Sequence, residues 1–313
     1  MKTFAPGKIV LTGAYAVLGG APAIVVATSR GAYADGERTA PTPTPEVAAA
    51  LGDAAPAPHV DASSLFVGAR KLGLGASAAI LVASMAVREA ERGVDLTSAD
   101  ARASLFQRAR EAHAVAQSGG SGVDVAASVH GGVLEYTLTS VRPVALPGGT
   151  VLTVFACGTS ARTAELRGFV DRLEESSPAV HRSRLGELTE IALEAAAAVG
   201  AGDRRALVDA IRLASRSLAR LGEAASAPIV PAGWDALGDA AAAEGAAFCV
   251  AGAGGGDVAA FVGSTRPSEA FLAQARTQGL FVLDVEVDEK GVRTVSPSAA
   301  HVATAREMFS SSS

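Results

Sequence analysis

Glycines stand next to lysine, serine or aspartate at several places in this chain. In the segment KLGLGASAA, residues 71–79, Gly73 and Gly75 come just before a run of helix-forming residues. Glycine lets the backbone approach a ligand closely, and the first turn of a helix presents unpaired N–H groups with partial positive charge. The segment therefore predicts an anion site, but an ordinary tight turn that packs a helix onto a sheet explains so short a pattern equally well.

Further glycine-rich segments strengthen the anion-site interpretation. KLGLGASAA is not the common P-loop, which has a lysine after its last glycine where this chain has Ala76 and Ser77. However, APGK places Lys8 beside a proline-glycine turn, and SGGSGVD places Asp124 at a second glycine-rich helix start. GAGGGD at residues 252–257 forms a third glycine-rich loop. Turns that repeatedly adjoin charged or hydroxyl side chains are difficult to assign to architecture alone.

Strands and helices must position these turns. Hydrophobic runs bounded by turn residues predict strands at residues 8–13, 23–29, 132–139, 151–157, 246–252, 258–263 and 280–288. Helix formers and caps predict helices at residues 76–93, 98–117, 177–200, 203–222 and 267–277, and a short helix between SGGSGVD and Gly131. The proline- and alanine-rich residues 39–58 predict a surface loop. This order of elements predicts an α+β fold.

The composition indicates a protein that acts on a small partner. The 313 residues are enough for two lobes, and a net charge of −5 without a long basic run gives no electrostatic footprint for nucleic acid or an anionic membrane. Cys157 and Cys249 lie far apart without a CxxC motif, so neither a disulfide framework nor a zinc site is expected. The N-terminus does not resemble a signal peptide and no apolar run is long enough to span a bilayer, so we expect a cytoplasmic protein with no membrane partner.

The order of the glycine-rich segments resembles one known family. APGK, GLGASAA, GSGVD and GAGGGD are similar to the motifs of the GHMP kinase superfamily, and the resemblance extends from about residue 5 to residue 263. This family includes galactokinase, homoserine kinase, mevalonate kinase and phosphomevalonate kinase. The resemblance implies a two-lobed α+β fold, with an S5-like lobe at residues 1–148 and a ferredoxin-like lobe at residues 149–313. It also implies a cleft for ATP, Mg²⁺ and a small acceptor, in a monomer or homodimer.

The resemblance assigns roles to the residues that match these motifs. Lys8 and Asp124 correspond to the catalytic pair, in which the lysine steadies the transferred phosphoryl group. The ATP-binding residues would be Lys71, Gly73, Leu74, Gly75, Ala76, Ser77 and Ala78, and Ser77 would also bind Mg²⁺. The acceptor-binding residues would be Tyr15, His113, Ser121, Gly122, Arg162, Gly252, Gly254, Gly255 and Asp257. Phosphoryl transfer depends mostly on positioning and charge compensation, which residues of these types supply.

Within the family, Lys71 just ahead of GLG and two segments are most similar to those of phosphomevalonate kinases. One is AHAVAQSGGSGVD, which contains His113 and Gln117, and the other is GTSARTAEL, which contains Arg162. That subgroup transfers a phosphoryl group from ATP to 5-phosphomevalonate and forms 5-diphosphomevalonate for isoprenoid synthesis. A phosphate acceptor has a second pKa near ~6 and is largely dianionic at neutral pH, so it requires cations more than a base. Lys8, Lys71 and Arg162 are the candidates.

Several positions leave alternatives open. GAY replaces the family's GEY, with Ala14 at the glutamate position, and Ala76 replaces the first serine of GLGSSAA. Tyr15 is either an acceptor-pocket residue or a core tyrosine, and Arg30 and Arg70 are equally well explained as surface residues. Mevalonate kinase, or another small-molecule kinase of the family, is therefore the main alternative activity, followed by diphosphomevalonate decarboxylase. A non-catalytic relative that only binds ligand, and an unrelated α+β protein, are the remaining alternatives.

Overall fold

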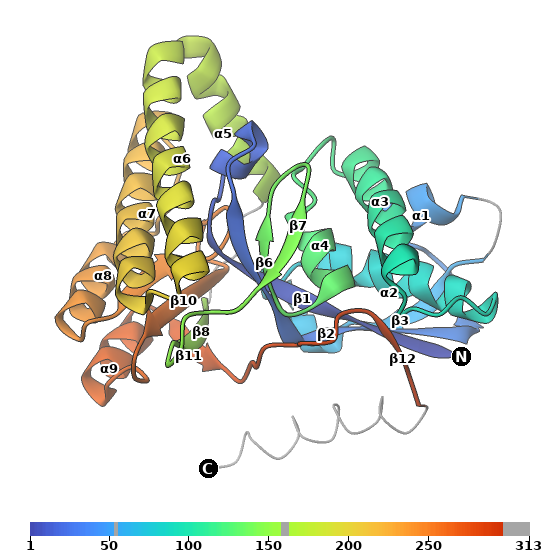
Figure 1. Cartoon of the computed structure of the whole chain (residues 1–313). Coiled ribbons are helices and arrows are strands. Elements are labelled where there is room, and N and C mark those ends of the chain that lie inside the picture. The colour runs from blue at the N-terminus through green and yellow to red at the C-terminus, as the bar shows by residue number, and fades with distance from the viewer. Residues whose placement is uncertain (53–55, 158–162, 297–313) are drawn as a thin grey trace.

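The computed structural model describes residues 1–52, 56–157 and 163–296. Two antiparallel sheets, each covered by helices, form the described part of the chain (Figure 1). This arrangement confirms the predicted α+β class. The proposed division of the chain at residues 148 and 149 remains a prediction, because residues that follow the second sheet return to the first.

The first sheet has six strands in the order β12-β1-β2-β6-β7, with β3 paired to β2. These strands are β1 (Lys2–Thr12), β2 (Ala23–Thr39), β3 (Pro58–Asp61), β6 (Val133–Tyr136), β7 (Val141–Val144) and β12 (Arg293–Val295). A separate hairpin consists of β4 (Phe66–Val67) and β5 (Arg70–Lys71). The helical elements of this half are η1 (Ala16–Gly19), η2 (Ser63–Leu65), α1 (Pro45–Leu51), α2 (Ala76–Glu91), α3 (Ala99–Ala116) and α4 (Val123–His130).

The second sheet has four strands in the order β11-β8-β10-β9. They are β8 (Val151–Cys157), β9 (Ala247–Val250), β10 (Val258–Gly263) and β11 (Leu280–Leu283). The helices of this half are α5 (Thr163–Ser176), α6 (Pro178–Ala201), α7 (Arg204–Ala225), α8 (Trp234–Ala243) and α9 (Glu269–Thr277). Figure 1 shows α6 and α7 as long neighbouring helices that rise from this sheet.

Strand β1 brings Lys8 to the turn that precedes α2. The APGK segment is not the turn that its proline and glycine predict, because it lies inside β1, where the register with β2 shifts between Pro6 and Gly7. The Lys8 backbone N–H donates to the Leu74 carbonyl over 2.8 Å. A Cβ at Gly7 would lie only 2.5 Å from the Leu74 oxygen, so this close approach of strand and turn requires glycine.

The expectation that residues 39–58 form only a surface loop was wrong in part. The helix α1 lies within this segment, begins at a Thr44 cap whose side chain accepts from the Val47 N–H, and has Pro45 in its first turn. The Glu46 side chain of this helix is buried and accepts a hydrogen bond from Gln117 Nε2 over 2.5 Å. Burial alone would raise the pKa of Glu46, but hydrogen bonds from its own backbone, Gln117 and Thr44 lower it. The helix is therefore packed against α3.

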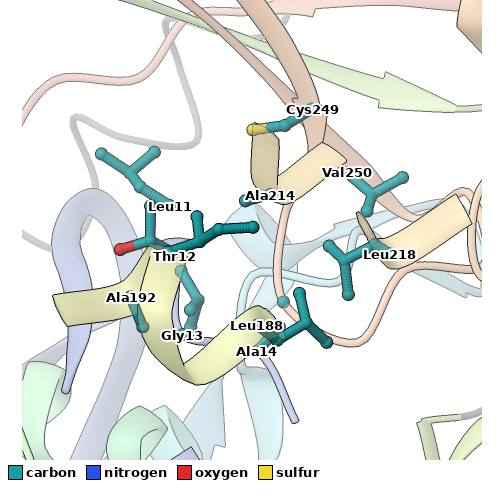
Figure 2. Close-up of a pocket in the computed structure, with 13 residues that line it drawn as sticks. Leu11, Thr12, Gly13, Ala14, Leu188, Ala192, Ala214, Leu218, Cys249 and Val250 are labelled. Atoms are coloured by element: carbon teal, nitrogen blue, oxygen red, sulfur yellow. The ribbon is translucent and has the colours of Figure 1, made fainter. Parts of the chain in front are cut away.

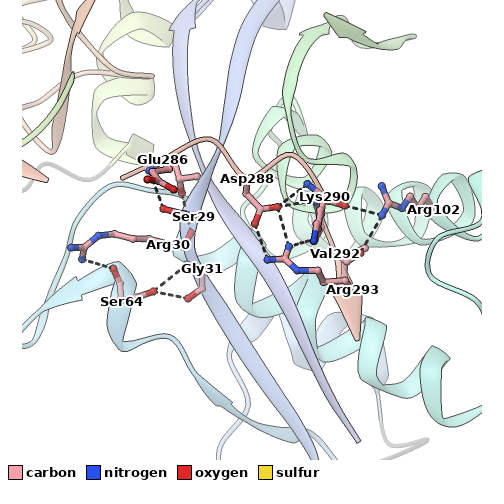
Figure 3. Close-up of polar contacts among 12 residues, drawn as sticks. Ser29, Arg30, Gly31, Ser64, Arg102, Glu286, Asp288, Lys290, Val292 and Arg293 are labelled. Carbon is pink, nitrogen blue, oxygen red and sulfur yellow. Dashed lines mark hydrogen bonds and ion pairs between the residues drawn. The ribbon is translucent and has the colours of Figure 1, made fainter. Parts of the chain in front are cut away.

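The segment between β11 and β12 runs back along the first sheet (Figure 3). The predicted strand at residues 280–288 ends at Leu283, and the chain beyond it bonds to β2. The Asp288 N–H donates to the Ala27 carbonyl, and the Asp288 carboxylate pairs with Arg293 at 2.9 Å. Arg102 of α3 donates to the Lys290 carbonyl over 2.8 Å. These bonds fasten the end of the described chain to the first sheet.

The partly buried ring of His130, at the end of α4, should make the stability of the protein depend on pH. Its ring lies 5.6 Å from the Phe106 ring, and burial, followed by the charge of Arg102, lowers the pKa of His130 from 6.5 to about 4. Below pH 6.5 the unfolded chain therefore gains a proton that the folded chain does not, so stability falls as pH falls. Urea unfolding should show that the free energy of unfolding falls between about pH 7.5 and about pH 4.5. The fall should be about 2 kcal/mol larger in the wild-type protein than in His130→Gln. Equal losses in both proteins would contradict the lowered pKa.

Across the described residues, none of the helices is both long enough and apolar enough to cross a bilayer.

Candidate functional site

A cavity of about 430 Å³ brings together side chains from both halves of the molecule. Its walls come from β1, η1, the first turns of α2 and α4, the end of α3, the start of α5 and the loop after β9. Eight residues predicted from the sequence line it: Lys8, Tyr15, Ser77, His113, Ser121, Gly122, Asp124 and Gly252. The structure therefore gathers at one site residues that lie up to 244 positions apart in the sequence, as Lys8 and Gly252 do.

Lys8 and Asp124 form the charged pair of this cavity. The Lys8 ammonium lies 3.6 Å from Asp124 Oδ1, and the Lys8 side chain is only 11% exposed. The same ammonium donates weakly to the Gly73 carbonyl over 3.5 Å and lies near Gly252. A lysine held in this way can neutralise an anion that approaches the turn before α2.

The turn at Gly73–Gly75 lies beside Lys8 and just before Ser77, although its own residues do not line the described cavity. Both glycines have positive φ, +77° and +78°, a conformation that favours glycine. A Cβ at Gly73 would lie 2.4 Å from the Cβ of Asp257, so the third glycine-rich loop packs directly on this turn. Leu74, Ala76 and Ala78 have buried side chains, so any contact they make with a ligand must come through their backbone. The Gly75 cap leaves the first N–H groups of α2 without a capping side chain.

Ser77 lies in the first turn of α2 and is held by α3. Its hydroxyl is 3.2 Å from His113 Nε2, and both residues line the cavity. In the described part of the chain, no cluster of three or more histidine, cysteine or acidic side chains can hold a metal ion. Mg²⁺ usually takes one or two protein oxygens and completes its shell with water and substrate phosphates. The Ser77 hydroxyl and the Asp124 carboxylate fit that pattern, so Mg²⁺ would require a bound nucleotide here.

The second glycine-rich segment fixes Asp124 at a helix start. Gly122 caps α4 with φ +80°, and a Cβ there would lie 2.7 Å from the Arg110 side chain. The Tyr136 hydroxyl donates to the Ser121 carbonyl, which anchors the loop from the sheet side. Asp124 follows in the first turn, where the helix dipole favours a negative charge.

The third glycine-rich loop is tied to η1 and to the chain that follows α7. The Tyr15 hydroxyl donates to the Ala253 carbonyl over 2.8 Å, and burial raises the pKa of Tyr15, which keeps the hydroxyl a donor. Tyr15 has φ +62°, which is uncommon for a bulky residue. Gly254 approaches Ile229 so closely that a Cβ would lie 2.1 Å from the Ile229 oxygen, and the Gly255 N–H donates to the same oxygen. Tyr15 thus serves both as a core tyrosine and as part of the cavity wall.

Some predicted residues do not line the cavity. Lys71 is exposed on the β4–β5 hairpin and is absent from the described cavity lining, so its predicted role at the phosphates has no geometric support. Arg162 lies outside the described residues. Arg30 donates to the Asp284 and Ser64 carbonyls, which ties β2 to two neighbouring segments. The structure thus assigns Arg30 a packing role.

Several cavity residues were missed from the sequence. Arg167 and Asp171 of α5 line the cavity, as do Gln117 and Gly119 at the end of α3. The spacing of Arg167 and Asp171, four residues apart on a helix, is typical of a solvated ion pair and gives no signal of a binding site. Gln117 belongs to the AHAVAQ motif, which is the signal that pointed to its neighbourhood.

A second, enclosed pocket lies where β1, α6, α7 and β9 meet (Figure 2). Its volume of about 10 Å³ is too small for more than a single water. Leu188, Leu218 and Val250 are among its apolar walls. Burial raises the pKa of the Cys249 thiol in this wall to about 12, so the thiol stays protonated and unreactive at neutral pH. This pocket is a packing defect and has no catalytic group.

The comparisons with known proteins support the same fold and family. No family model matches the chain. A phosphomevalonate kinase from Streptomyces sp. (strain CL190) is 35% identical over 232 residues, which cover 66% of this chain and 61% of that protein. A mevalonate kinase from Aeropyrum pernix is 31% identical over 258 residues, which cover 71% of this chain and 77% of that protein. The match thus spans less than two thirds of the Streptomyces relative.

Solved structures share the fold at low sequence identity. Streptococcus pneumoniae phosphomevalonate kinase, in complex with phosphomevalonate and AMPPNP, superposes with a TM-score of 0.71 at 17% identity. The match covers 92% of this chain and 99% of that chain. The two-lobed α+β fold is therefore that of the small-molecule kinases to which the glycine-rich motifs pointed. The chain belongs to the GHMP kinase family.

Proposed function

We propose that this protein transfers the γ-phosphoryl group of ATP to 5-phosphomevalonate and releases 5-diphosphomevalonate. The observation that carries the proposal is the Lys8–Asp124 pair, which lines one cavity together with Ser77 of the glycine-bounded turn. A cation, a carboxylate and helix-end N–H groups around one space are the parts that phosphoryl transfer requires.

In this mechanism the turn at Gly73–Gly75 and the first N–H groups of α2 bind the β- and γ-phosphates of ATP. Mg²⁺, bound through the phosphates and the Ser77 hydroxyl, would neutralise charge on the transferred group. Lys8 lies between the turn and Asp124, so its ammonium can hold the incoming and transferred phosphates together. Such cations are needed because both reactants are anions.

Asp124 orients Lys8 and faces the acceptor. The 3.6 Å pair keeps the ammonium of Lys8 directed at the cavity. An acceptor phosphate is already a nucleophile at neutral pH, since its second pKa is near ~6, so Asp124 then acts chiefly by positioning Lys8 and the acceptor oxygen. With a hydroxyl acceptor, the same carboxylate would have to take the proton.

The acceptor assignment rests on the similarity to phosphomevalonate kinase and on the AHAVAQSGGSGVD segment around the cavity. Mevalonate kinase is the second candidate, because the Aeropyrum relative with that name matches over a larger share of its length. Both activities would use the same Lys8–Asp124 pair and differ in whether the reacting oxygen belongs to a phosphate or a hydroxyl.

Phosphorus NMR of the purified protein tests the proposal. The protein is incubated with Mg-ATP and, separately, with mevalonate, 5-phosphomevalonate or 5-diphosphomevalonate. We expect new diphosphate signals only with 5-phosphomevalonate, matched by an equal amount of ADP. A new monophosphate from mevalonate would assign the second candidate activity, and phosphate release with loss of the diphosphate would indicate decarboxylation. No acceptor-dependent change in any mixture would overturn the proposal.

A further inference from the structure

Arg167 is a cavity cation that the reaction described above does not use. It lies near the start of α5 and, with Lys8, is one of two lysine or arginine residues among the described residues that line the cavity. Lys8 is already engaged by Asp124 and the turn at Gly73–Gly75. The cavity therefore contains a second positive group on an element that contributes nothing to the phosphate-binding turns.

The partner of Arg167 leaves its guanidinium available. Arg167 Nε lies 3.8 Å from Asp171 Oδ2, one helical turn further along α5, and the two side chains are 39% and 60% exposed. An exposed pair at this distance contributes little, so a ligand can replace it readily. Asp171 also lines the cavity, so both members of the pair face the same space.

The Arg167 guanidinium lies close to the backbone of Gly119. Gly119 has φ +112°, and a Cβ built on it would lie 3.1 Å from Arg167 Nη1. A side chain at residue 119 would therefore crowd the guanidinium. Gly119 is separated by only four residues from Asp124, so Arg167 lies over the loop that leads to the catalytic carboxylate.

The other walls fit an aliphatic acceptor with a charge at each end. Val10, Val17 and Leu18 line the same cavity as the charged groups. The η1 helix, which contains Val17 and Leu18, is next to Tyr15, and Tyr15 shares a hydrophobic cluster with Leu166 of α5. Lys8 lies on β1 and Arg167 on α5, so the two cations line the cavity from different elements. Among the described residues, no ion pair within 4.0 Å joins Arg167 to Asp124.

From these observations we infer that Arg167 binds the carboxylate at the non-reacting end of the acceptor. The inference rests on the proposed function, in which the reacting oxygen lies at Lys8 and Asp124. A planar guanidinium can donate two parallel hydrogen bonds to a carboxylate, which a lysine cannot do. Since 5-phosphomevalonate and mevalonate carry the same carboxylate, Arg167 fixes the orientation of either acceptor and selects against short alcohols and phosphates that lack it.

Steady-state kinetics of Arg167→Gln tests this role. We expect the KM of the acceptor to rise by about 30-fold or more, with the KM of ATP unchanged and kcat within about 3-fold, because a lost charge-assisted pair weakens binding at an end that does not react. Arg167→Lys should recover only part of the loss. The matched control is Arg172→Gln, in which the substituted guanidinium stacks on Phe169 at 4.4 Å and does not line the described cavity.

An acceptor analogue separates this inference from the proposed function. The analogue has a primary alcohol in place of the carboxylate and keeps the reacting group. The wild-type protein should use the analogue with a KM raised as much as in Arg167→Gln, and Arg167→Gln should barely distinguish the two acceptors. If Arg167→Gln raises the KM of both acceptors by the same factor, or raises neither, the inference is wrong. Turnover of 5-phosphomevalonate by the wild-type protein would still support the proposed function. If the wild-type protein uses neither 5-phosphomevalonate nor mevalonate, the proposed function itself fails.

Discussion

Asp124→Asn should lower kcat by about 10³-fold while ATP still binds with nearly its normal affinity. The amide keeps the size of the side chain but removes the charge that holds the Lys8 ammonium at 3.6 Å. Without it, Lys8 is free to pair with the nucleotide phosphates alone, and the acceptor oxygen loses its orienting group. In the proposed mechanism the nucleotide contacts come from the turn before α2, whose Gly75 cap this substitution leaves intact.

Single-turnover phosphoryl transfer and calorimetric titration with a non-hydrolysable ATP analogue measure the two effects separately. Asp100→Asn is the matched control, because Asp100 is also in the first turn of a helix, α3, but is exposed and does not line the described cavity. The control should keep wild-type turnover. Wild-type turnover in Asp124→Asn would remove Asp124 from the catalytic site, and an equal loss in the control would point to a general effect on the fold.

The residues that local sequence could identify are those at glycine-rich turns. Lys8, Ser77 and Asp124 each lie beside glycines whose backbone conformation or close approach only glycine permits, so the sequence carried a direct signal of them. The same reasoning predicts that the start of α2 binds an anion.

The elements that the sequence did not predict depend on long-range packing. Arg167 lines the cavity because α5 packs against α6 and α7, and no local pattern encodes those contacts. Lys71 was predicted at the site from the resemblance to the family's motif, but its side chain is exposed on the β4–β5 hairpin. The pairing of β12 with β1 is also a long-range contact, because it places Lys2 opposite Val295, almost 300 residues away in the sequence.

The helix α1 was missed for a different reason. Its segment is rich in proline, a composition that favours a loop, although local helix-start signals lie within it. Thr44 as a cap, Pro45 in the first turn and Glu46 after it are a typical helix start. Composition describes a whole segment, whereas a cap and a first-turn proline fix the position of one helix, so the local signals should have prevailed.

Gly75→Val should raise the KM of ATP by about 100-fold or more. Gly75 has φ +78°, which a β-branched residue adopts only with strain, and a Cβ there would lie 3.0 Å from Cγ of Lys8. The new side chain would therefore disturb both the N–H groups at the start of α2 and the lysine that faces them. Nucleotide affinity, measured by titration with a fluorescent ATP analogue, should fall together with turnover.

Gly93→Val is the control that separates a specific loss of nucleotide binding from the general effect of backbone strain. Gly93 follows the other end of the same helix with φ +81°, and a Cβ there would meet no atom within 4 Å. Both variants should therefore lose a similar free energy of unfolding through strain, about 1–2 kcal/mol. Only Gly75→Val should lose nucleotide affinity, because only its Cβ meets Lys8. Equal nucleotide affinity in the two variants would mean that the turn before α2 does not bind the phosphates of ATP.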